Sequence, residues 1–220
     1  MDAGYAIFPN VFQRFEIEHL MEALSADRIE RTRAGARRIL GIPTVHQLAN
    51  DARLLTIASD FVGPTAVPFR ATLFDKSATA NWLVVWHQDT ALPLRERFDD
   101  PEWGPWSIKG GVIHAHAPAW ALEQVIALRV HLDDSTATNG PLRVLPGSHR
   151  HGVFSDDQVA QLASATAPVD CTAASGGVVA MRPLTVHASS KSADDRRRRV
   201  LHIEYASTVR LASHVELSVG

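Results

Sequence analysis

Cysteine is scarce in this chain. Only Cys171 occurs among the 220 residues, so no disulfide can form within the chain. Stable disulfides belong to oxidising compartments and are rare in the cytosol. The first 20 residues also lack the basic start and the apolar run of a secretory signal peptide. Together these absences predict a cytoplasmic protein.

Long apolar runs and a surplus of one charge are missing too. No segment approaches the roughly 20 apolar residues that a membrane-spanning helix needs. The chain has 22 lysines and arginines against 24 aspartates and glutamates, for a formal net charge of −2. Proteins that bind nucleic acids or membrane surfaces by global electrostatics carry a basic surplus. We therefore expect no nucleic-acid partner and no membrane partner.

The N-terminal third has the apolar spacing of helices. Ile17, Leu20, Met21 and Leu24 follow the i, i+3, i+4, i+7 pattern of a helix that buries one face. Residues 50–63 repeat the pattern, with an Asn-Asp pair at the start and Gly-Pro at the end. We predict a helical part at about residues 14–63.

From residue 65 the chain changes to short segments rich in β-branched and aromatic residues, separated by turn residues. These segments are TAVPFRATLF, NWLVVWH, GVIHAH, VIALRVHL, GGVVAM and RVLHIEYA. Helical patterns do not alternate with them, except at 156–164, so antiparallel sheets in a sandwich, jelly roll or barrel are expected. Since 220 residues suit one domain, we predict a single domain over 1–220, mainly β with flanking helices, whose β core spans about 65–208.

Residues 90–111 stand apart within this β region. The segment carries three prolines, three glycines, two tryptophans and a block of charge. Loops of this length in compact domains are often lids or binding loops. The alternative is a surface excursion that Trp103 and Trp106 pack down. Both interpretations remain open from the sequence.

Histidine is followed two positions later by an acidic residue at four places. The four pairs are His87 and Asp89, His131 and Asp133, His202 and Glu204, and His214 and Glu216. Side chains two apart on a strand share one face, so each pair can aim at one point. The last pair is close to the end of the chain, the second runs into a turn-rich stretch, and the third sits in a strand with no adjoining loop. The pair at 87 and 89 ends a strand beside the long loop, which favours it as a metal site.

A second histidine completes a known metal-binding arrangement. Two imidazoles and one carboxylate on one face of a metal form the facial triad of non-haem Fe(II) oxygenases. His187 ends another strand-like run, about 100 residues after His87. In a barrel of two sheets, residues this far apart in sequence can lie on adjacent strands at one mouth.

Three stretches, taken in order, resemble one known family. They are FDKSATANWLVVWHQD, NGPLRVLPGSHRHG and GGVVAMRPLTVHASSKSADDRRRRVLHIEYA. Their combination resembles the phytanoyl-CoA dioxygenase family of iron- and 2-oxoglutarate-dependent oxygenases, from GYAIFPNVF to about Ala206. The resemblance implies a double-stranded β-helix, a jelly-roll and cupin-like core. It also implies that His87, Asp89 and His187 bind Fe(II).

The resemblance further implies a site for the cosubstrate 2-oxoglutarate. Arg198, eleven residues after the second histidine ligand, matches the arginine that binds its distal carboxylate, and Ser189 matches a serine that also touches it. Lys76 and Asn81 fall where the family often has polar residues near the site. Arg199 remains the alternative anchor, because Arg198 and Arg199 point to opposite faces of a strand.

The expected function is a dioxygenase that uses Fe(II), 2-oxoglutarate and O2 to hydroxylate a C–H bond of a small molecule, releasing succinate and CO2. Two alternatives remain: a cupin-like metal enzyme that does not use 2-oxoglutarate, and a non-catalytic protein that binds 2-oxoglutarate or another ligand on the same scaffold. The candidates to line a substrate pocket are Trp82, Trp103, Trp106, His114, His116 and Arg97.

Overall fold

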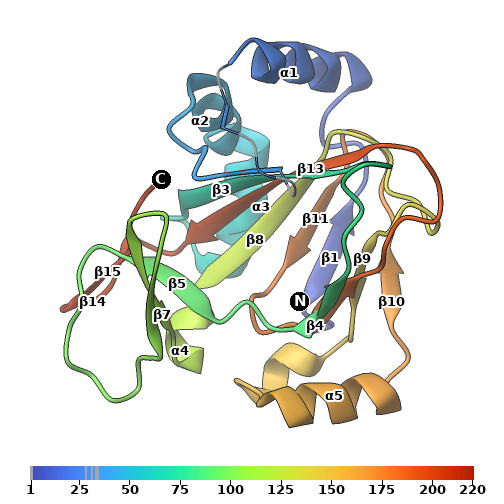
Figure 1. Ribbon diagram of the computed structural model, residues 1–220. Coiled ribbons are helices and arrows are strands. Elements are labelled where there is room, and N and C mark those ends of the chain that lie inside the picture. The colour runs from blue at the N-terminus through green and yellow to red at the C-terminus, as the bar shows by residue number, and fades with distance from the viewer. Residues whose placement is uncertain (1, 28, 31, 33–34) are drawn as a thin grey trace.

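Two facing antiparallel sheets form the centre of the computed structural model, which describes residues 2–27, 29–30, 32 and 35–220 (Figure 1). The larger sheet has the order β1 (Tyr5–Phe8), β11 (Val178–Met181), β8 (Val125–His131), β13 (Arg198–Ala206), β3 (Val67–Lys76) and β2 (Gly35–Arg37). The smaller sheet has the order β10 (Val169–Cys171), β9 (Leu142–Val144), β12 (His187–Ser189) and β4 (Val84–His87). The predicted mainly β, jelly-roll architecture with flanking helices is confirmed.

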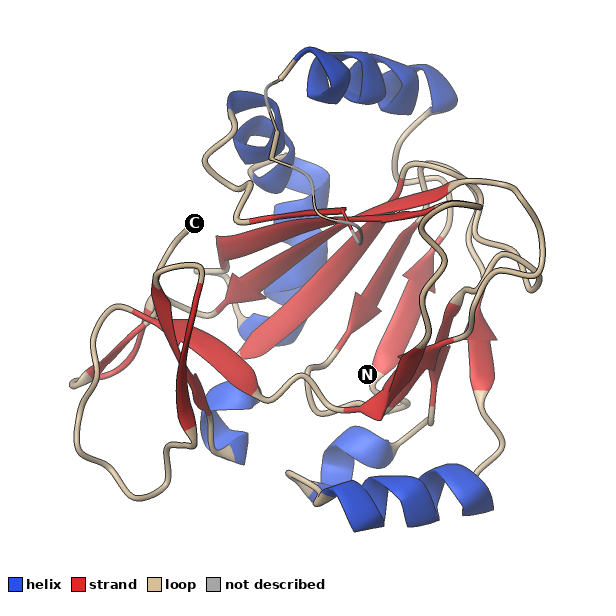
Figure 2. Cartoon of the chain, in the orientation of Figure 1, coloured by secondary structure: helices blue, strands red, loops and turns tan. Residues whose placement is uncertain are grey.

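Three helices cover the outer face of the larger sheet: α1 (Arg14–Ala26), α2 (Pro43–Ala49) and α3 (Ala52–Val62) (Figure 2). Strand β8 shows why they pack there. Ile126, Leu128 and Val130 point to the helices and belong to the same buried cluster as Leu54 of α3. Burial of such side chains contributes about 1.5–3 kcal/mol each. The predicted N-terminal helices are confirmed, and Asp51 caps α3 by accepting from the backbone N–H of Arg53.

The alternate residues of the same strands face the interior between the sheets. On β13, Leu201, Ile203 and Tyr205 join the helical cluster, whereas His202 and Glu204 line a cavity. This alternation follows from the period of two along a strand. The interior of the barrel is therefore polar on one wall, and this is the wall that meets the site described below.

A smaller lobe completes the chain. It consists of the three-stranded sheet β5 (Ala91–Leu94), β7 (Val112–His116) and β6 (Trp106–Lys109), with the hairpin β14 (Arg210–Ala212) and β15 (Val215–Glu216). Helix α4 (Ala119–Leu122) packs in the apolar cluster of this lobe. The 3-10 helix Ser148–His151 and α5 (Asp156–Ala165) lie beside the smaller sheet. Among the described residues, no helix has the length and apolarity needed to cross a bilayer.

Two features differ from the sequence prediction. Strand β2 lies in the part expected to be helical, and β1 lies before that part, where no strand was predicted. Each is a short edge strand held by pairing with β3 or β11. The segment 90–111 is not a plain loop, since β5 and β6 both pair with β7. Leu92 and Leu94 of β5 are buried in a second apolar cluster, which explains why this proline-containing segment is ordered into strands.

Candidate active site

His87, Asp89 and His187 meet at one wall of the interior cavity. His87 ends β4 and His187 begins β12, and the register of these two antiparallel strands places the two histidines opposite each other. The Nε2 atom of His87 lies 3.6 Å from Oδ1 of Asp89, and Nε2 of His187 lies 3.5 Å from its Oδ2. One ligand atom from each residue lies within 4.8 Å of the others. In the described part of the chain, this is the one such group of histidine, cysteine or acidic side chains.

The backbone orients both imidazoles for binding a metal. Nδ1 of His87 is 2.8 Å from the carbonyl of Val85, and Nδ1 of His187 is 2.9 Å from the carbonyl of Thr185. A carbonyl only accepts hydrogen bonds, so each Nδ1 carries the proton and donates it. The lone pair of each Nε2 therefore points toward Asp89. Such outer hydrogen bonds fix the ring orientation of histidine ligands in metal sites.

The charges at this point also suit a metal ion. Burial lowers the pKa of His187 to about 4, so its imidazole is neutral near pH 7. Burial opposes the charge of Asp89, but the neighbouring imidazoles of His187 and His87 outweigh it and hold the pKa of Asp89 below its ordinary value. A neutral imidazole and an ionised carboxylate are the forms that bind divalent metals. Two nitrogens and one oxygen beside an open cavity fit the donor set of a non-haem Fe(II) site.

The cavity beside this group has a volume of about 800 Å³. Of the predicted site residues, His87, Asp89, His187, Ser189, Arg198, Trp82, His114 and His116 line it. Lys76 lies just behind the wall, where its ammonium donates to Ser189 Oγ at 3.0 Å and to the carbonyl of Ser190 at 2.6 Å. Asn81 does not line the cavity. Its side-chain amide donates to the carbonyl of Ser192 and accepts from the N–H of Ser192, which fastens the segment after β12.

The two adjacent arginines on β13 have different surroundings. Arg199 points away from the cavity and pairs with Asp133, with both nitrogen–oxygen distances 2.8 Å. Arg198 lines the cavity, is 3% exposed and donates through Nε to the carbonyl of Asn139 at 3.2 Å. Its Nη1 is buried and has no hydrogen-bond partner within the described residues. A buried guanidinium with an unused donor fits a carboxylate ligand, because an unpaired buried charge is costly.

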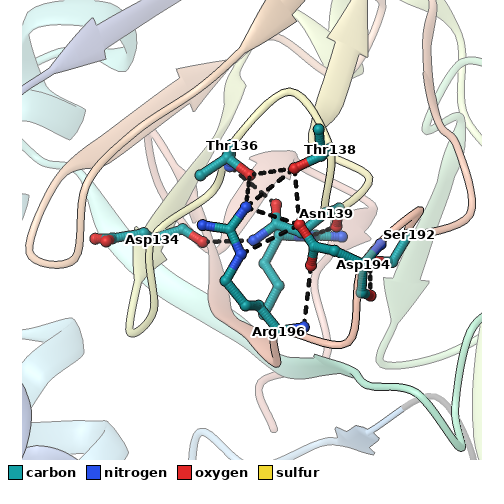
Figure 3. Close-up of polar contacts among 8 residues, drawn as sticks. Asp134, Thr136, Thr138, Asn139, Ser192, Asp194 and Arg196 are labelled. Atoms are coloured by element: carbon teal, nitrogen blue, oxygen red, sulfur yellow. Dashed lines mark hydrogen bonds and ion pairs between the residues drawn. The ribbon is translucent and has the colours of Figure 1, made fainter.

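A network of hydrogen bonds between two loops, at 134–139 and 192–196, surrounds Asn139, whose carbonyl accepts from Arg198 (Figure 3). Arg196 pairs with Asp194 at 2.7 Å and donates to Thr138 at 3.0 Å. The Thr138 hydroxyl in turn donates to Asp194, while Asn139 donates to the carbonyl of Asp134 at 2.8 Å. The exposed Arg196 thus stabilises the loop that contains Asn139. The carbonyl of Asn139 accepts the hydrogen bond from the buried Arg198.

Sequence reasoning missed several cavity residues. Arg129 on β8 lines the cavity, and its guanidinium is 3.1 Å from Nδ1 of His202. The sequence disfavours His202 and Glu204 as site residues because no loop adjoins their strand, yet both line the cavity. Glu204 forms a two-point ion pair with Arg70 of β3. The available signal was the alternation of polar and apolar residues along β8 and β13, which marks a polar interior face.

Three of the predicted pocket residues lie elsewhere. Trp103 is 4% exposed and packs in the apolar cluster of the smaller lobe, with Phe98 and Trp120 at ring distances of 5.4 and 6.0 Å. Trp106 packs on the same phenylalanine, and the guanidinium of Arg97 lies 5.3 Å above its ring. These residues were predicted as substrate candidates from their place in segment 90–111, and the structure puts them in the packing of that segment.

The ion pair between Arg70 and Glu204 gives a stability prediction. Replacing Arg70 by methionine leaves the Glu204 carboxylate, whose side chain is 4% exposed, without its partner. Breaking a buried pair in this way costs about 3–5 kcal/mol. Urea unfolding should show a loss of this size. The matched variant Arg95→Met removes one of the two arginines that pair with Glu216, where the Arg95 side chain is 69% exposed, and should leave the unfolding midpoint unchanged. Equal midpoints for both variants would contradict the assignment.

Comparison with known proteins points to one family. A model described as "Phytanoyl-CoA dioxygenase (PhyH)" matches residues 2–200. The chain is 26% identical over 147 residues to an L-proline trans-4-hydroxylase from Streptomyces griseoviridis, covering 55% of this chain and 54% of that protein. It is 27% identical over 163 residues to an ectoine dioxygenase from Sphingopyxis alaskensis, covering 67% and 46%. The chain therefore spans about half the length of these relatives.

A solved structure supports the fold. The crystal structure of EctD from S. alaskensis with 2-oxoglutarate and 5-hydroxyectoine matches with a TM-score of 0.70 and 23% identity, covering 93% of this chain and 72% of that chain. At this identity the likeness shows a shared architecture.

Proposed function

We propose, from the premise that this chain belongs to the phytanoyl-CoA dioxygenase family, that it is an Fe(II)- and 2-oxoglutarate-dependent dioxygenase that hydroxylates a C–H bond of a small molecule. One observation carries this proposal: His87, Asp89 and His187 converge on a cavity that also holds the guanidinium of Arg198, whose Nη1 has no hydrogen-bond partner among the described residues. When bound, Fe(II) and 2-oxoglutarate supply the O2-dependent chemistry that introduces the hydroxyl group and releases succinate and CO2.

The metal is held by Nε2 of His87, Nε2 of His187 and a carboxylate oxygen of Asp89. The two Nδ1–carbonyl hydrogen bonds keep both rings turned toward the ion. The carboxylate neutralises part of the metal charge in a setting that is partly closed to water. The cavity lined by these three residues would give the keto-acid and O2 room to reach the metal.

The cosubstrate is held at its distal carboxylate by Arg198, whose planar guanidinium offers two parallel N–H donors. Ser189 and Lys76 adjoin this place and are linked by a hydrogen bond of 3.0 Å. Burial, with Arg198 and Arg129 nearby, lowers the pKa of Lys76 to about 8. A bound carboxylate would raise the pKa of Lys76 again, so anion binding and the charge of Lys76 support each other. Asn81 acts indirectly, because its hydrogen bonds to Ser192 fix the segment that follows Ser189.

An anaerobic titration tests the proposed function. Adding 2-oxoglutarate to the protein with Fe(II) is expected to produce a weak visible charge-transfer band, because the keto-acid chelates the iron. Zn(II), whose d shell is full, should bind without giving the band and serves as the control. Binding of Fe(II) without any change on addition of 2-oxoglutarate would favour a cupin-like enzyme that does not use this cosubstrate. Absence of both would overturn the proposal.

A further inference from the structure

Three cationic side chains from two separate sheets line the opening of the cavity. Arg37 ends β2 at the edge of the larger sheet, and Arg38 follows it, while Lys109 ends β6 of the smaller lobe. All three are exposed and all three line the cavity, which places them at its opening. Below, they are called the mouth cations.

A hydrogen bond joins the two sides of the opening. The guanidinium of Arg38 donates to the carbonyl of Gly110, directly after Lys109. Arg38 itself has a φ of 58°, a left-handed conformation that is uncommon for an arginine. Residues held in such conformations cluster at ligand-binding and active sites. The hydrogen bond from Arg38, directly after β2, therefore ties this edge of the larger sheet to the turn after Lys109.

In the part of the chain that the structure describes, no acidic side chain forms an ion pair with a mouth cation. Among the described residues, neither the side chain of Arg37 nor that of Lys109 has a hydrogen bond or an ion pair. The nearby arginine of β3 is different, because Arg70 is paired with Glu204. Like charges that converge without counterions repel one another, so this arrangement favours a ligand of opposite charge.

The charge of the whole cavity leads to the same conclusion. Six cationic side chains and two carboxylates line it among the described residues, a surplus of four positive charges when the histidines are neutral. The cations are Arg37, Arg38, Arg70, Lys109, Arg129 and Arg198, and the carboxylates are Asp89 and Glu204. The two charges of Fe(II) and the two of the 2-oxoglutarate dianion cancel each other. Filling the proposed catalytic site thus leaves the surplus in place.

His114 reports the positive field at this point. Its side chain lines the cavity on β7, next to β6. Burial lowers the pKa of His114, and the charges of Arg70, Lys109 and Arg37 lower it further. Cations from the larger sheet and from the smaller lobe therefore act on one side chain, which supports the geometry derived above.

We propose that the substrate is a small anion, whose carboxylate or phosphate group is bound at the cavity opening by Arg37, Arg38 and Lys109. This inference rests on the proposed function, since it assigns the remaining part of the same cavity to the substrate. The anionic group is held at the opening, and the body of the molecule extends inward past Trp82 and His114 toward the metal ligands. The same positive opening attracts an anionic substrate from solution.

The test uses three probes of similar shape. Phenyl phosphate, phenylacetate and neutral phenylacetamide are titrated calorimetrically into the anaerobic protein loaded with Fe(II) and 2-oxoglutarate, and separately into the metal-free protein. At least one of the two anions should bind, about tenfold or more tightly than the amide, because hydrogen bonds to charged groups are strong. Binding should weaken as salt is added. The anion that binds more tightly indicates whether the substrate carries a phosphate or a carboxylate group.

The variants locate the binding. Arg37→Gln with Lys109→Gln should weaken the anion about tenfold or more and leave the band with 2-oxoglutarate unchanged. The control double variant, Arg14→Gln with Lys191→Gln, removes two exposed cations that do not line the cavity and should bind the anion as the wild type does.

Two results would overturn the inference: equal affinity for the amide and both anions, or anion affinity that is unchanged in the Arg37 and Lys109 double variant. In either case a normal band with 2-oxoglutarate would leave the proposed function standing. Conversely, loss of anion binding in that variant would support the anion site even if 2-oxoglutarate gave no band. The missing band would then contradict the oxygenase proposal alone.

Discussion

Replacing Asp89 by alanine is expected to abolish measurable turnover, with a loss of about 1,000-fold or more, equivalent to about 4 kcal/mol in the activation barrier. Asp89 is the one acidic side chain of the three-residue group. Without it, a divalent ion would have two neutral imidazoles and no carboxylate. We expect Fe(II) affinity to fall with activity, and equilibrium dialysis with metal analysis measures it.

The control for this variant is Asp60→Ala. Asp60 is exposed on α3, on the outer face of the larger sheet, and does not line the cavity. The control should bind Fe(II) and turn over as the wild type does. Circular dichroism should show that both variants keep their β structure. A folded Asp89→Ala protein with wild-type Fe(II) affinity would contradict the assignment of this carboxylate as a ligand.

Replacing Arg198 by lysine is expected to weaken 2-oxoglutarate binding by about 10- to 100-fold. Lysine keeps the positive charge but loses the planar pair of N–H donors that matches a carboxylate. Each hydrogen bond to a charged group contributes about 1.5–3 kcal/mol, and 1.4 kcal/mol corresponds to tenfold in affinity. Titration of the visible band under anaerobic conditions gives the dissociation constant.

The neighbouring residue supplies a matched control. Arg199→Lys makes the same chemical change one position along β13, where the side chain points away from the cavity and pairs with Asp133. Its affinity for 2-oxoglutarate should stay close to that of the wild type. The reverse result, with weakened binding in Arg199→Lys and normal binding in Arg198→Lys, would assign the anchor to the other arginine.

Much of the architecture follows from local patterns in the sequence. The helices α1 and α3 have strong apolar periodicity, and their buried residues Ile17, Leu24 and Leu54 fall on the predicted faces. The long strands β3, β8 and β13 follow from runs of β-branched and apolar residues. These elements are predictable because their burial pattern repeats over several turns or several residue pairs.

Short edge strands do not carry such a pattern. Strand β2 has three residues and β1 has four, and each exists because a neighbouring strand offers a ladder of backbone partners. Tertiary pairing of this kind depends on residues far away in the sequence. The position of Arg37 at the cavity opening was therefore not predictable, because it depends on the register of β2 against β3.

The interior of the barrel explains the other omissions. Sequence reasoning assigns polar residues on a strand to solvent and apolar residues to the core. In β13 only the second half of this rule holds, since Leu201 and Ile203 pack under the helices as expected, whereas His202 and Glu204 are also buried, in the cavity wall. For the same reason, hydrophobicity alone favours Arg199 as the cosubstrate anchor, whereas the family spacing favours Arg198.

The convergence of His87 and His187 was predicted from motif spacing and family resemblance, and the pairing of β4 with β12 brings the two residues together. The role of this group as an iron site remains a proposal. Its most direct test is a crystal structure of the protein prepared anaerobically with Fe(II) and 2-oxoglutarate, with diffraction recorded at the iron absorption edge. We predict one anomalous peak bonded to His87, Asp89 and His187, with the keto-acid reaching Arg198. An iron peak elsewhere, or none at these three residues, would contradict the account.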